Sequence, residues 1–342
     1  MLWDGIARRA FGGSAELGAE PPAVPASRER GRLKIGLALG GGAARGWSHI
    51  GMLRVLEREG IRPDVIAGSS IGAVVGGCYA AGKLDELERF ARLLSKRRVM
   101  SLLDFHLGGS GLIAGDRLKR LLERDLADLR IESLPLRFGT IATELGTGHE
   151  IWLTKGPLVE AIRASYALPG IIDPVRLRGR LLMDGALVNP IPITTARAMG
   201  ADLVICVNLN GDFKLRGTTI QSIEEEEDEV VEAVIEEPRR WGLFGPMRDA
   251  ADRVRGRGRS GSFGPGIASV MIDAFNITQD RISRSRLAGD PPDLMISPKL
   301  AGVGLFEFHR AEEIIELGRQ ATERVLPDLL ELVTEAGRLR PA

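Results

Sequence analysis

The order of apolar runs, glycine-rich turns and helical segments near the start of the chain limits the fold more than any other feature. An apolar run at 33–39 leads directly into a glycine-rich stretch at 40–46, and apolar residues at helical spacing follow as far as Gly60. A second apolar run at 65–67 leads through another turn into a helix-like stretch at 73–81. This alternation predicts parallel strands covered by helices, and therefore an α/β fold.

The second turn, residues 68–72, has the spacing G-x-S-x-G with Ser70 at its centre. A nucleophile elbow needs small residues on both sides of its serine, because the sharp turn from strand to helix strains the backbone and crowds the side chain. Ser70 is therefore a candidate nucleophile, and an ordinary glycine-rich turn entering a helix is the alternative interpretation. Active sites of parallel sheets lie at the carboxyl ends of the strands, so we expect the stretch 40–46 and Ser70 to be neighbours.

The rest of the chain continues the alternation of helices and strands. An apolar strand at 181–186 places the carboxylate of Asp184 at its exit. Further strands are expected at 137–145, 150–153, 201–209 and 294–297, and further helices at 84–94, 115–129, 158–167, 267–287, 308–325 and, restarted by Pro327 at a first turn, up to Val333. Together these elements predict one domain at 32–337, which holds the candidate nucleophile Ser70.

Two segments depart from this alternation. Residues 1–31 mix Gly, Ala, Pro and charges, which is typical of a flexible extension, while the apolar residues of its first turns also fit a short interfacial helix. Residues 211–264 combine an acidic run at 224–229 with a glycine-rich stretch that holds arginines at 253–259. Blocks of opposite charge usually form solvated loops, so we predict a mobile insertion, with contact to anionic lipid as the alternative role of its arginines.

Charge and cysteine content exclude several classes of function. Lys plus Arg and Asp plus Glu both number 46, so no net field draws the chain to nucleic acid, and we expect no nucleic-acid partner. Cys78 and Cys206 lie in apolar surroundings, which favours buried free thiols and indicates a reducing compartment. No apolar stretch approaches the roughly 18 residues of a spanning helix, and the N-terminus lacks the pattern of a signal peptide. We therefore expect a cytoplasmic protein, with peripheral contact at the inner face of the membrane left open.

Other uses of a glycine-rich turn fit this sequence poorly. A Rossmann dinucleotide site requires an acidic residue at the end of the second strand, but that strand ends in Gly-Ser-Ser at 68–70. A Walker phosphate loop requires Gly-Lys-Ser/Thr, but Gly46 is followed by Trp-Ser. An α/β-hydrolase triad would place a histidine after its aspartate, as His309 is placed here, but that fold presents its serine only after several strands, and here two precede it.

Three motifs occur in a fixed order, and the combination is more specific than any one of them. They are the stretch GGGAARGWSHIG at 40–51, the elbow around Ser70, and Asp184-Gly185-Ala186. This combination resembles the patatin-like phospholipases, and especially the bacterial RssA type, which is grouped with the neuropathy-target-esterase branch of that family. The stretches at 162–165, 184–192 and 288–293 add to the resemblance, which covers about residues 33–325. It implies a three-layer α/β/α patatin-like fold with a mainly parallel central sheet.

The resemblance also implies the chemistry. The chain would be a serine esterase, or lipid acyl hydrolase, of the lysophospholipase or phospholipase A type, with a lipid or lysophospholipid substrate and no metal or cofactor. Ser70 would be the nucleophile and Asp184 its base, a dyad that forms an acyl-serine intermediate. The N–H groups of Gly41 and Gly42 would stabilise the oxyanion. The residues that would support the motifs are Gly40, Ala43, Arg45, Gly46, Gly68, Gly72 and Gly185.

Several details stay open at this stage. Arg45 would either place charge near the oxyanion or form a structural salt bridge. Ala43 stands where many relatives carry a fourth glycine, and because alanine resists positive φ, we expect a small difference in the geometry of the loop. A non-catalytic regulatory or scaffolding protein on the same fold is the alternative function, and the oligomeric state is not predicted. The histidines are predicted to be structural or surface residues, since none has metal-ligand spacing with another: His49, His106, His149 and His309.

Overall fold

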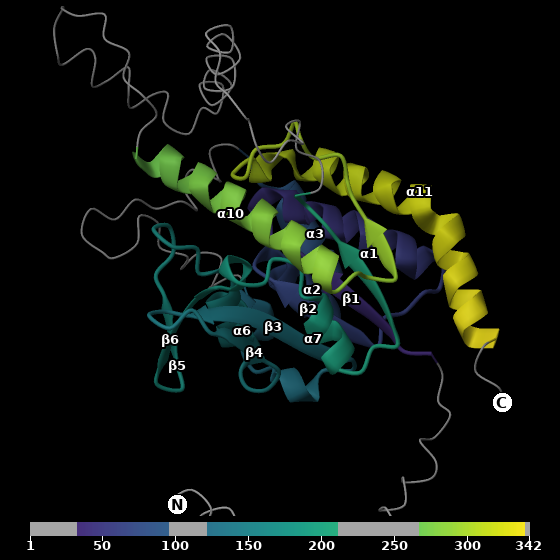
Figure 1. Ribbon diagram of the computed structural model, residues 1–342, viewed down its shortest axis with the longest axis horizontal. Helices are drawn as coiled ribbons and strands as arrows, with labels where there is room; N and C mark the ends of the chain where they lie inside the picture. The colour runs from purple at the N-terminus through teal and green to yellow at the C-terminus, as the bar shows by residue number, and fades with distance from the viewer. Residues whose placement is uncertain (1–32, 96–121, 211–266, 339–342) are drawn as a thin grey trace, which may run out of the picture.

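The strands form one eight-stranded sheet in the order β5-β6-β3-β2-β1-β7-β8, with β4 paired to β3 outside this path (Figure 1). The computed structural model describes residues 33–95, 122–210 and 267–338. The strands are β1 (Ile35–Leu39), β2 (Val65–Ser69), β3 (Arg137–Glu144), β4 (Glu150–Leu153), β5 (Val175–Leu177), β6 (Arg180–Asp184), β7 (Leu203–Val207) and β8 (Leu294–Ile296).

Helices and short 3-10 turns connect these strands. The α-helices are α1 (Ser48–Arg58), α2 (Ile71–Ala80), α3 (Leu84–Arg92), α6 (Leu158–Tyr166), α7 (Ile193–Ala198), α10 (Ile267–Gly289) and α11 (Ala311–Arg338). The 3-10 turns are η1 (Ala43–Trp47), η2 (Ile131–Ser133), η3 (Gly185–Leu187) and η6 (Phe308–Arg310).

The sheet is parallel on one side and antiparallel on the other. β1 is parallel to β2 and β7, β2 is parallel to β3, and β7 is parallel to β8. β4 and β6 are antiparallel to β3, and β5 is antiparallel to β6. The predicted parallel core is therefore confirmed. The antiparallel part is less regular, and its strand β5 and the short helix α7 are absent from the prediction because each is too short to leave a periodic pattern.

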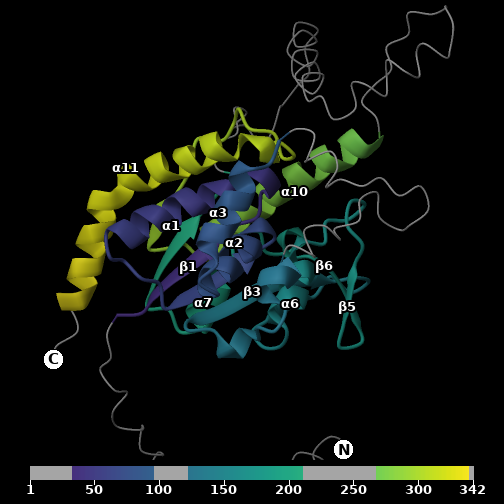
Figure 2. The same cartoon turned by 180° about the vertical axis from the view of Figure 1, so that it is seen from behind.

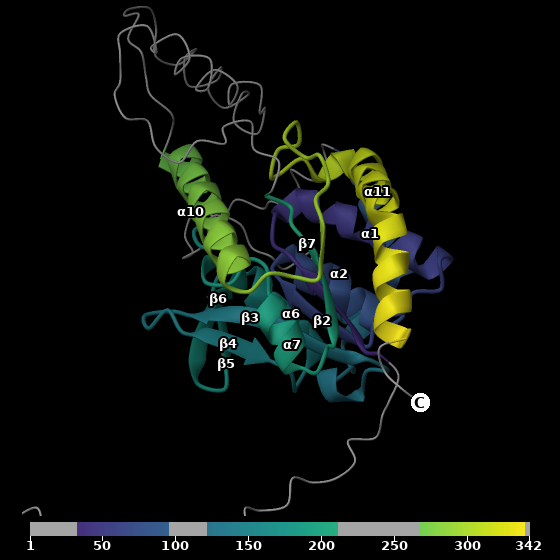
Figure 3. The same ribbon diagram turned by 45° about the vertical axis from the view of Figure 1, so that its right-hand side comes forward.

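Helices cover both faces of the sheet (Figures 2 and 3). Helices α1, α2, α3, α6 and α11 pack in the larger hydrophobic cluster on one face, and α7 with Leu287 of α10 packs in the smaller cluster on the other. Along β1, Leu37 and Leu39 belong to the larger cluster and Ala38 to the smaller one. A strand buried on both faces has no polar face, which explains its unbroken apolar run. The three-layer α/β/α architecture is as predicted.

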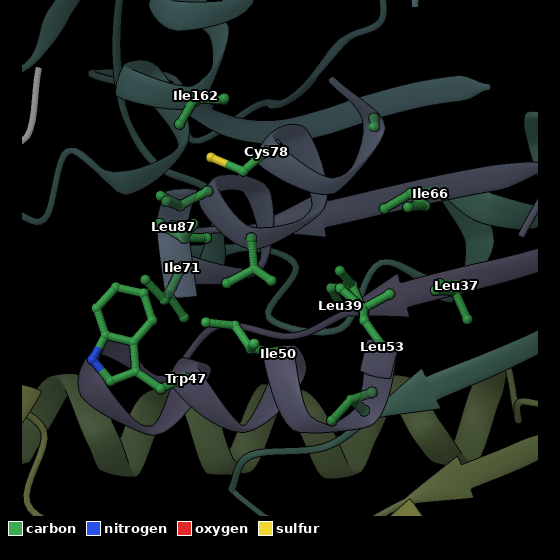
Figure 4. Packing of buried hydrophobic residues seen from close by; sticks show 14 of the residues in the cluster. Leu37, Leu39, Trp47, Ile50, Leu53, Ile66, Ile71, Cys78, Leu87 and Ile162 are labelled. Carbon is green, nitrogen blue, oxygen red and sulfur yellow. The ribbon is translucent and has the colours of Figure 1, made fainter. Parts of the chain in front are cut away.

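The larger cluster joins the first helix to the first strand. Figure 4 shows Ile50 and Leu53 of α1 beside Leu37 and Leu39 of β1, and all four side chains are fully buried. Burial of one such side chain contributes about 1.5–3 kcal/mol to folding. This packing fixes the direction in which the chain leaves β1, and with it the place of the glycine-rich stretch.

The last helix differs from the prediction. The sequence predicts that Pro327 restarts a helix, but Pro327 lies inside the single helix α11. An interior proline removes one backbone hydrogen bond and costs about 3 kcal/mol. Close packing of α11 against α1 offsets this cost. A Cβ on Gly51 of α1 would lie 1.9 Å from the carbonyl oxygen of Ile315, and a Cβ on Gly318 of α11 would lie 2.0 Å from the carbonyl oxygen of Ser48, so both positions require glycine. The two helices therefore pack backbone to backbone, and α11 curves along its length (Figure 1).

Other predictions meet the structure only in part. Of the helix expected at 115–129, residues 122–126 are helical, and the part before 122 lies outside the described residues. The extension at 1–31 and the insertion at 211–264 also lie outside them. Cys78 and Cys206 are buried and free, as predicted. Within the described ranges, no helix combines the length and the apolar character needed to cross a bilayer.

Candidate active site

The pairing of β3 brings the ends of β2 and β6 together. Thr140 pairs with β2 and with β4, and Ala142 pairs with β4 and with β6, so β2 and β6 share the edge of β3 opposite to β4. β2 runs parallel to β3 and β6 runs antiparallel to it, so the carboxyl ends of β2 and β6 point at each other. Ser69 at the end of β2 pairs with Ile141, and Asp184 at the end of β6 pairs with the next residue, Ala142. The elbow serine and the aspartate therefore meet on one edge of a strand.

At this meeting point Ser70 Oγ donates a hydrogen bond of 2.6 Å to Asp184 Oδ2. The other carboxylate oxygen, Oδ1, accepts the N–H of Ala186 at 2.8 Å, and Thr143 Oγ1 donates to the main-chain carbonyl of Asp184 at 2.8 Å. Asp184 is 1% exposed and Ser70 is 8% exposed. Burial raises the pKa of Asp184 to about 7, against the lowering effect of the bonds from Ser70 and Ala186. A carboxylate in this setting can take the proton of the serine hydroxyl.

The backbone of the elbow is strained at the serine itself. Ser70 has φ 55° and ψ −123°, a conformation that costs a non-glycine residue of order 1–3 kcal/mol. The glycines on either side are required for space instead. A Cβ on Gly72 would lie 2.1 Å from the carbonyl oxygen of Leu39, and one on Gly68 would lie 2.6 Å from Cα of Ala73. The G-x-S-x-G spacing thus lets α2 begin directly against β1 and β2.

Ser165 of α6 also holds the elbow. Its Oγ accepts the N–H of Ser70 at 2.9 Å, and its side chain is fully buried. This bond satisfies an N–H that the strained turn removes from regular pairing. The sequence indicates no role for Ser165 beyond membership of the stretch 162–165, because a contact between residues 95 positions apart leaves no local pattern.

The glycine-rich stretch lies against both candidate catalytic residues. A Cβ on Gly41 would lie 2.9 Å from Cβ of Ala186 and 3.3 Å from Cβ of Ser70, so the predicted proximity of the two motifs is confirmed. The N–H of Gly41, however, donates to the carbonyl of Pro190 at 3.0 Å, and this bond would have to open before Gly41 could bind an oxyanion. Gly42 stands at the N-cap of η1, where backbone N–H groups have no partner within the helix.

Ala43 has an unexpected conformation for an alanine. Its φ is 47°, in the left-handed region that favours glycine, and this costs an L-residue roughly 1–2 kcal/mol. The loop therefore has the positive φ that a fourth glycine would adopt freely, and the backbone carries the strain. The expectation that alanine would avoid this conformation is wrong.

The last part of the chain supports the glycine-rich stretch. Arg45 is 5% exposed, and its Nε donates to the main-chain carbonyl of Val303 at 2.9 Å. Burial lowers the pKa of Arg45 to about 10, so the guanidinium still carries its charge at neutral pH. The N–H of Ala44 donates to the carbonyl of Leu305 at 2.9 Å. Arg45 thus ties η1 to the segment that precedes α11.

The remaining motif glycines permit close approach. A Cβ would lie 2.7 Å from the carbonyl oxygen of Val207 if placed on Gly40, and 2.3 Å from the Ile71 side chain if placed on Gly46. A Cβ on Gly185 would lie 2.2 Å from the carbonyl oxygen of Ile141. Side chains at these positions would push the glycine-rich stretch and Asp184 away from the sheet.

The described histidines lie in different settings. His49 is fully buried, and its Nε2 lies 2.9 Å from the carbonyl oxygen of Gly40, which can only accept, so Nε2 carries the proton. Burial lowers the pKa of His49 to about 4, and the ring is neutral at pH 7. His149 is exposed and contacts Glu144 at 3.4 Å, His309 lies in η6, and His106 lies outside the described residues. In residues 33–95, 122–210 and 267–338 no group of three His, Cys, Asp or Glu side chains could hold a metal ion.

Comparison with known proteins places these motifs in a family context. The model of the patatin-like phospholipase family matches residues 37–197. An uncharacterized NTE family protein of Mycobacterium tuberculosis (strain H37Rv) is 34% identical over 348 residues, which cover 89% of this chain and 95% of that protein. The lysophospholipase NTE1 of Yarrowia lipolytica is 36% identical over 180 residues, 51% of this chain and 12% of that protein.

A mouse protein gives a similar match. The patatin-like phospholipase domain-containing protein 6 of Mus musculus is 35% identical over 181 residues, 51% of this chain and 13% of that protein. The Yarrowia lipolytica and mouse relatives thus match over about half of this chain, while the mycobacterial relative matches over most of both chains. Together these similarities support a lipid hydrolase.

Proposed function

Because this chain belongs to the NTE family of patatin-like phospholipases, we propose that it hydrolyses carboxylic esters of lipids through an acyl-Ser70 intermediate. The proposed substrates are lysophospholipids or phospholipids, as in a lysophospholipase or phospholipase A. The observation that carries this proposal is the 2.6 Å bond from Ser70 Oγ to Asp184 Oδ2. A serine hydroxyl is a weak nucleophile until a positioned base takes its proton, and the hydrogen bond supports Asp184 as that base.

In the proposed first step, Ser70 Oγ attacks the carbonyl carbon of the ester as its proton moves to Asp184. The carbonyl oxygen becomes an oxyanion, which the N–H of Gly42 would bind, joined by that of Gly41 once its bond to Pro190 opens. When the tetrahedral intermediate collapses, the C–O bond to the alcohol breaks and Asp184 returns the proton to that alcohol. The products of this step are the free alcohol and acyl-Ser70.

In the proposed second step, a water molecule attacks the acyl carbon and gives its proton to Asp184. Collapse of the intermediate breaks the bond to Ser70 Oγ, which recovers this proton from Asp184, and the fatty acid leaves as the carboxylic acid, which then loses its remaining proton to solvent. The pKa of Asp184, which burial raises to about 7, suits both directions of transfer, because a general acid–base group works best with a pKa near the working pH. This cycle needs no metal or cofactor.

The alternative is a non-catalytic regulatory or scaffolding protein on the same fold. The hydrogen-bonded Ser70 and Asp184 argue against it, because a buried carboxylate with a raised pKa costs folding free energy, and carboxylates perturbed in this way cluster at functional sites. We also propose that residues 32–337 act as one catalytic domain in the cytoplasm. Peripheral membrane contact through 1–31 or 211–264 would appear as co-sedimentation with anionic liposomes that is lost when the segment is deleted.

The proposed function is tested by covalent labelling with a fluorophosphonate, which reacts with activated serines. The intact protein should be labelled at Ser70, and Ser70→Ala should abolish labelling. Ser69→Ala is the matched control, because Ser69 is its buried neighbour and its Oγ has no hydrogen-bond partner. Hydrolysis of a panel of lysophospholipids and phospholipids then identifies head group and chain length. A folded protein without label would favour the non-catalytic alternative.

A further inference from the structure

Helix α10 is bonded to the segment that carries the candidate base. One guanidinium nitrogen of Arg286 donates to Glu150 Oε2 at 2.8 Å and to the main-chain carbonyl of Val188 at 3.0 Å. Glu150 Oε1 accepts from Asn189 Nδ2 at 2.7 Å and from Trp152 Nε1 at 2.7 Å. The Glu150 side chain is 20% exposed and that of Arg286 is 36% exposed, so the ion pair is only partly screened by water. These contacts join α10, β4 and residues 188–189.

Residues 184–190, which we call the base segment, connect two parts of the candidate site. At its start, Asp184 accepts from Ser70 and from Ala186. At its end, the carbonyl of Pro190 accepts the N–H of Gly41 at 3.0 Å. Arg286 and Glu150 contact the residues between these two ends. A shift of the middle would therefore move both the base and the glycine-rich stretch.

The end of α10 is also anchored by contacts outside the base segment. Leu287 packs against the smaller hydrophobic cluster, and Asp290 just after the helix accepts from Thr194 Oγ1 at 2.7 Å. Arg197 of α7 donates to the carbonyl of Pro291 at 2.8 Å. Arg286 thus projects from a fixed support, which is what a residue needs to hold another segment in place.

We propose that Arg286 and Glu150 are positioning residues, which fix the base segment so that Asp184 faces Ser70 and Pro190 holds Gly41. This inference rests on the proposed function, because it takes Asp184 as the base. Neither residue contacts Ser70 or the carboxylate of Asp184, so neither takes part in proton transfer. Their effect on catalysis comes through geometry, and a displacement of about 1 Å at reacting groups can cost a hundredfold in rate.

The pH dependence separates positioning from simple stabilisation. The polar groups that contact the carboxylate of Asp184 are the Ser70 hydroxyl and the Ala186 N–H, and both bonds lower its pKa. If the base segment loosens, the bond from Ala186 weakens and the pKa of Asp184 rises further. The acid limb of the reaction then moves to higher pH. A variant that is merely less stable would react less at every pH, but the midpoint of its acid limb would stay the same.

The experiment compares Arg286→Gln with Arg284→Gln in the full-length protein. Arg284 lies on the same helix, and its ion pair with Asp280 stays within α10, so this control removes the same charge without touching the base segment. Two quantities are measured: the rate at which a fluorophosphonate labels Ser70 as a function of pH, and amide hydrogen exchange in peptides that cover residues 184–190. Arg286→Lys keeps the charge, and Glu150→Gln tests the other partner.

For Arg286→Gln we expect labelling to slow by about ten- to a hundredfold, exchange in the base segment to rise, and the acid limb to move to higher pH. Arg284→Gln should stay within about twofold of the parent, and Arg286→Lys should recover part of the rate. The effects of Arg286→Gln and Glu150→Gln should be less than additive, as expected for one unit.

The outcomes separate this inference from the proposed function. If the parent protein is labelled, and Arg286→Gln leaves rate, pH midpoint and exchange unchanged, the inference is overturned. If the parent is not labelled but Arg286→Gln raises exchange at 184–190, the proposed function fails while the structural role of the pair stands. Should Arg286→Gln fail to fold by circular dichroism, Arg286→Lys and Glu150→Gln carry the same test.

Discussion

Ser70 and Asp184 meet at one point of the sheet but are held there in different ways. The turn that presents Ser70 is built from five consecutive residues, in which Gly68 admits the backbone of α2, Gly72 lets α2 approach β1, and the serine takes a positive φ. Asp184 depends on contacts that are distant in the chain, because β6 must lie on the free part of the edge of β3 and the base segment must be held by α10. The nucleophile is therefore a local structure, and the base is a product of tertiary packing.

The two residues also differ in the kind of free-energy cost that their surroundings impose. The turn at Ser70 stores backbone strain, while Asp184 stores the cost of a buried carboxylate, which appears as a pKa raised to about 7. Neighbouring residues offset part of each cost. Ser165 and the glycines support the elbow, and hydrogen bonds from Ser70 and Ala186 stabilise the carboxylate. Substitutions in the two regions should therefore fail in different ways.

The largest effect is expected from removal of the base. Asp184→Asn keeps the shape of the side chain but cannot accept a proton, so kcat for ester hydrolysis should fall by about three orders of magnitude or more. The fold should be retained, because an amide oxygen can still accept from Ala186. Kinetics with a water-soluble ester, together with circular dichroism, measure both quantities. Near-normal turnover of a homogeneous Asp184→Asn preparation would exclude Asp184 as the base.

A smaller effect is expected from acidification. The carboxylate is the working form of Asp184, so kcat/KM should fall about tenfold per pH unit below about pH 7.

The free energy of unfolding should respond to pH in the opposite sense. The folded-state pKa lies above its ordinary value of 3.8, so the folded protein binds the proton more tightly, and this contribution to stability is lost as pH rises from about 4 through about 7.

Urea unfolding checks the sign of that second effect. Asp184→Asn removes the titration, so its stability relative to the parent should improve between pH 5 and pH 8. A relative stability that does not change over this range would show that the pKa of Asp184 is close to its ordinary value.

The comparison also explains what the sequence could predict. The strand-turn-helix order around Ser70 and the apolar strands of the parallel part leave local patterns, so the sequence predicts both. The short strand β5, the antiparallel placement of β6 and the role of Arg286 depend on contacts such as that between Glu150 and Arg286, 136 positions apart. Asp184 itself was identified only because it belongs to a motif of known order. The positive φ of Ala43 was missed because tertiary contacts overrule the preference of a single residue.

A still smaller effect is expected from removal of Ser165, the residue of α6 that supports the elbow. Ser165→Ala leaves the buried N–H of Ser70 without an acceptor, which should cost about 1–3 kcal/mol of stability and, by loosening the elbow, about tenfold in kcat. Ser283→Ala is the control, because Ser283 is equally buried but its Oγ has no hydrogen-bond partner. An unchanged kcat in Ser165→Ala would mean that the glycines and the strand ends alone hold the nucleophile.

The smallest effects are expected at the histidines, and they test whether the base acts alone. If Asp184 takes the proton directly from Ser70, alanine at His106, His149 or His309 should leave kcat within a few-fold of the parent, whereas loss of a triad histidine costs orders of magnitude. His49 is excluded from this set, because its Nε2 donates to the carbonyl of Gly40 and its loss would disturb the glycine-rich stretch.

The decisive variant among these is His309→Ala, since His309 follows Asp184 in the order that a triad requires. Its kinetics should be measured beside those of His149→Ala, an exposed histidine whose contact is with Glu144. Because Ser70 Oγ already donates to Asp184 at 2.6 Å, a histidine between them would require that bond to break and the strand ends to separate. Loss of turnover in a folded His309→Ala protein would therefore demand such a rearrangement, and would replace the dyad with a triad.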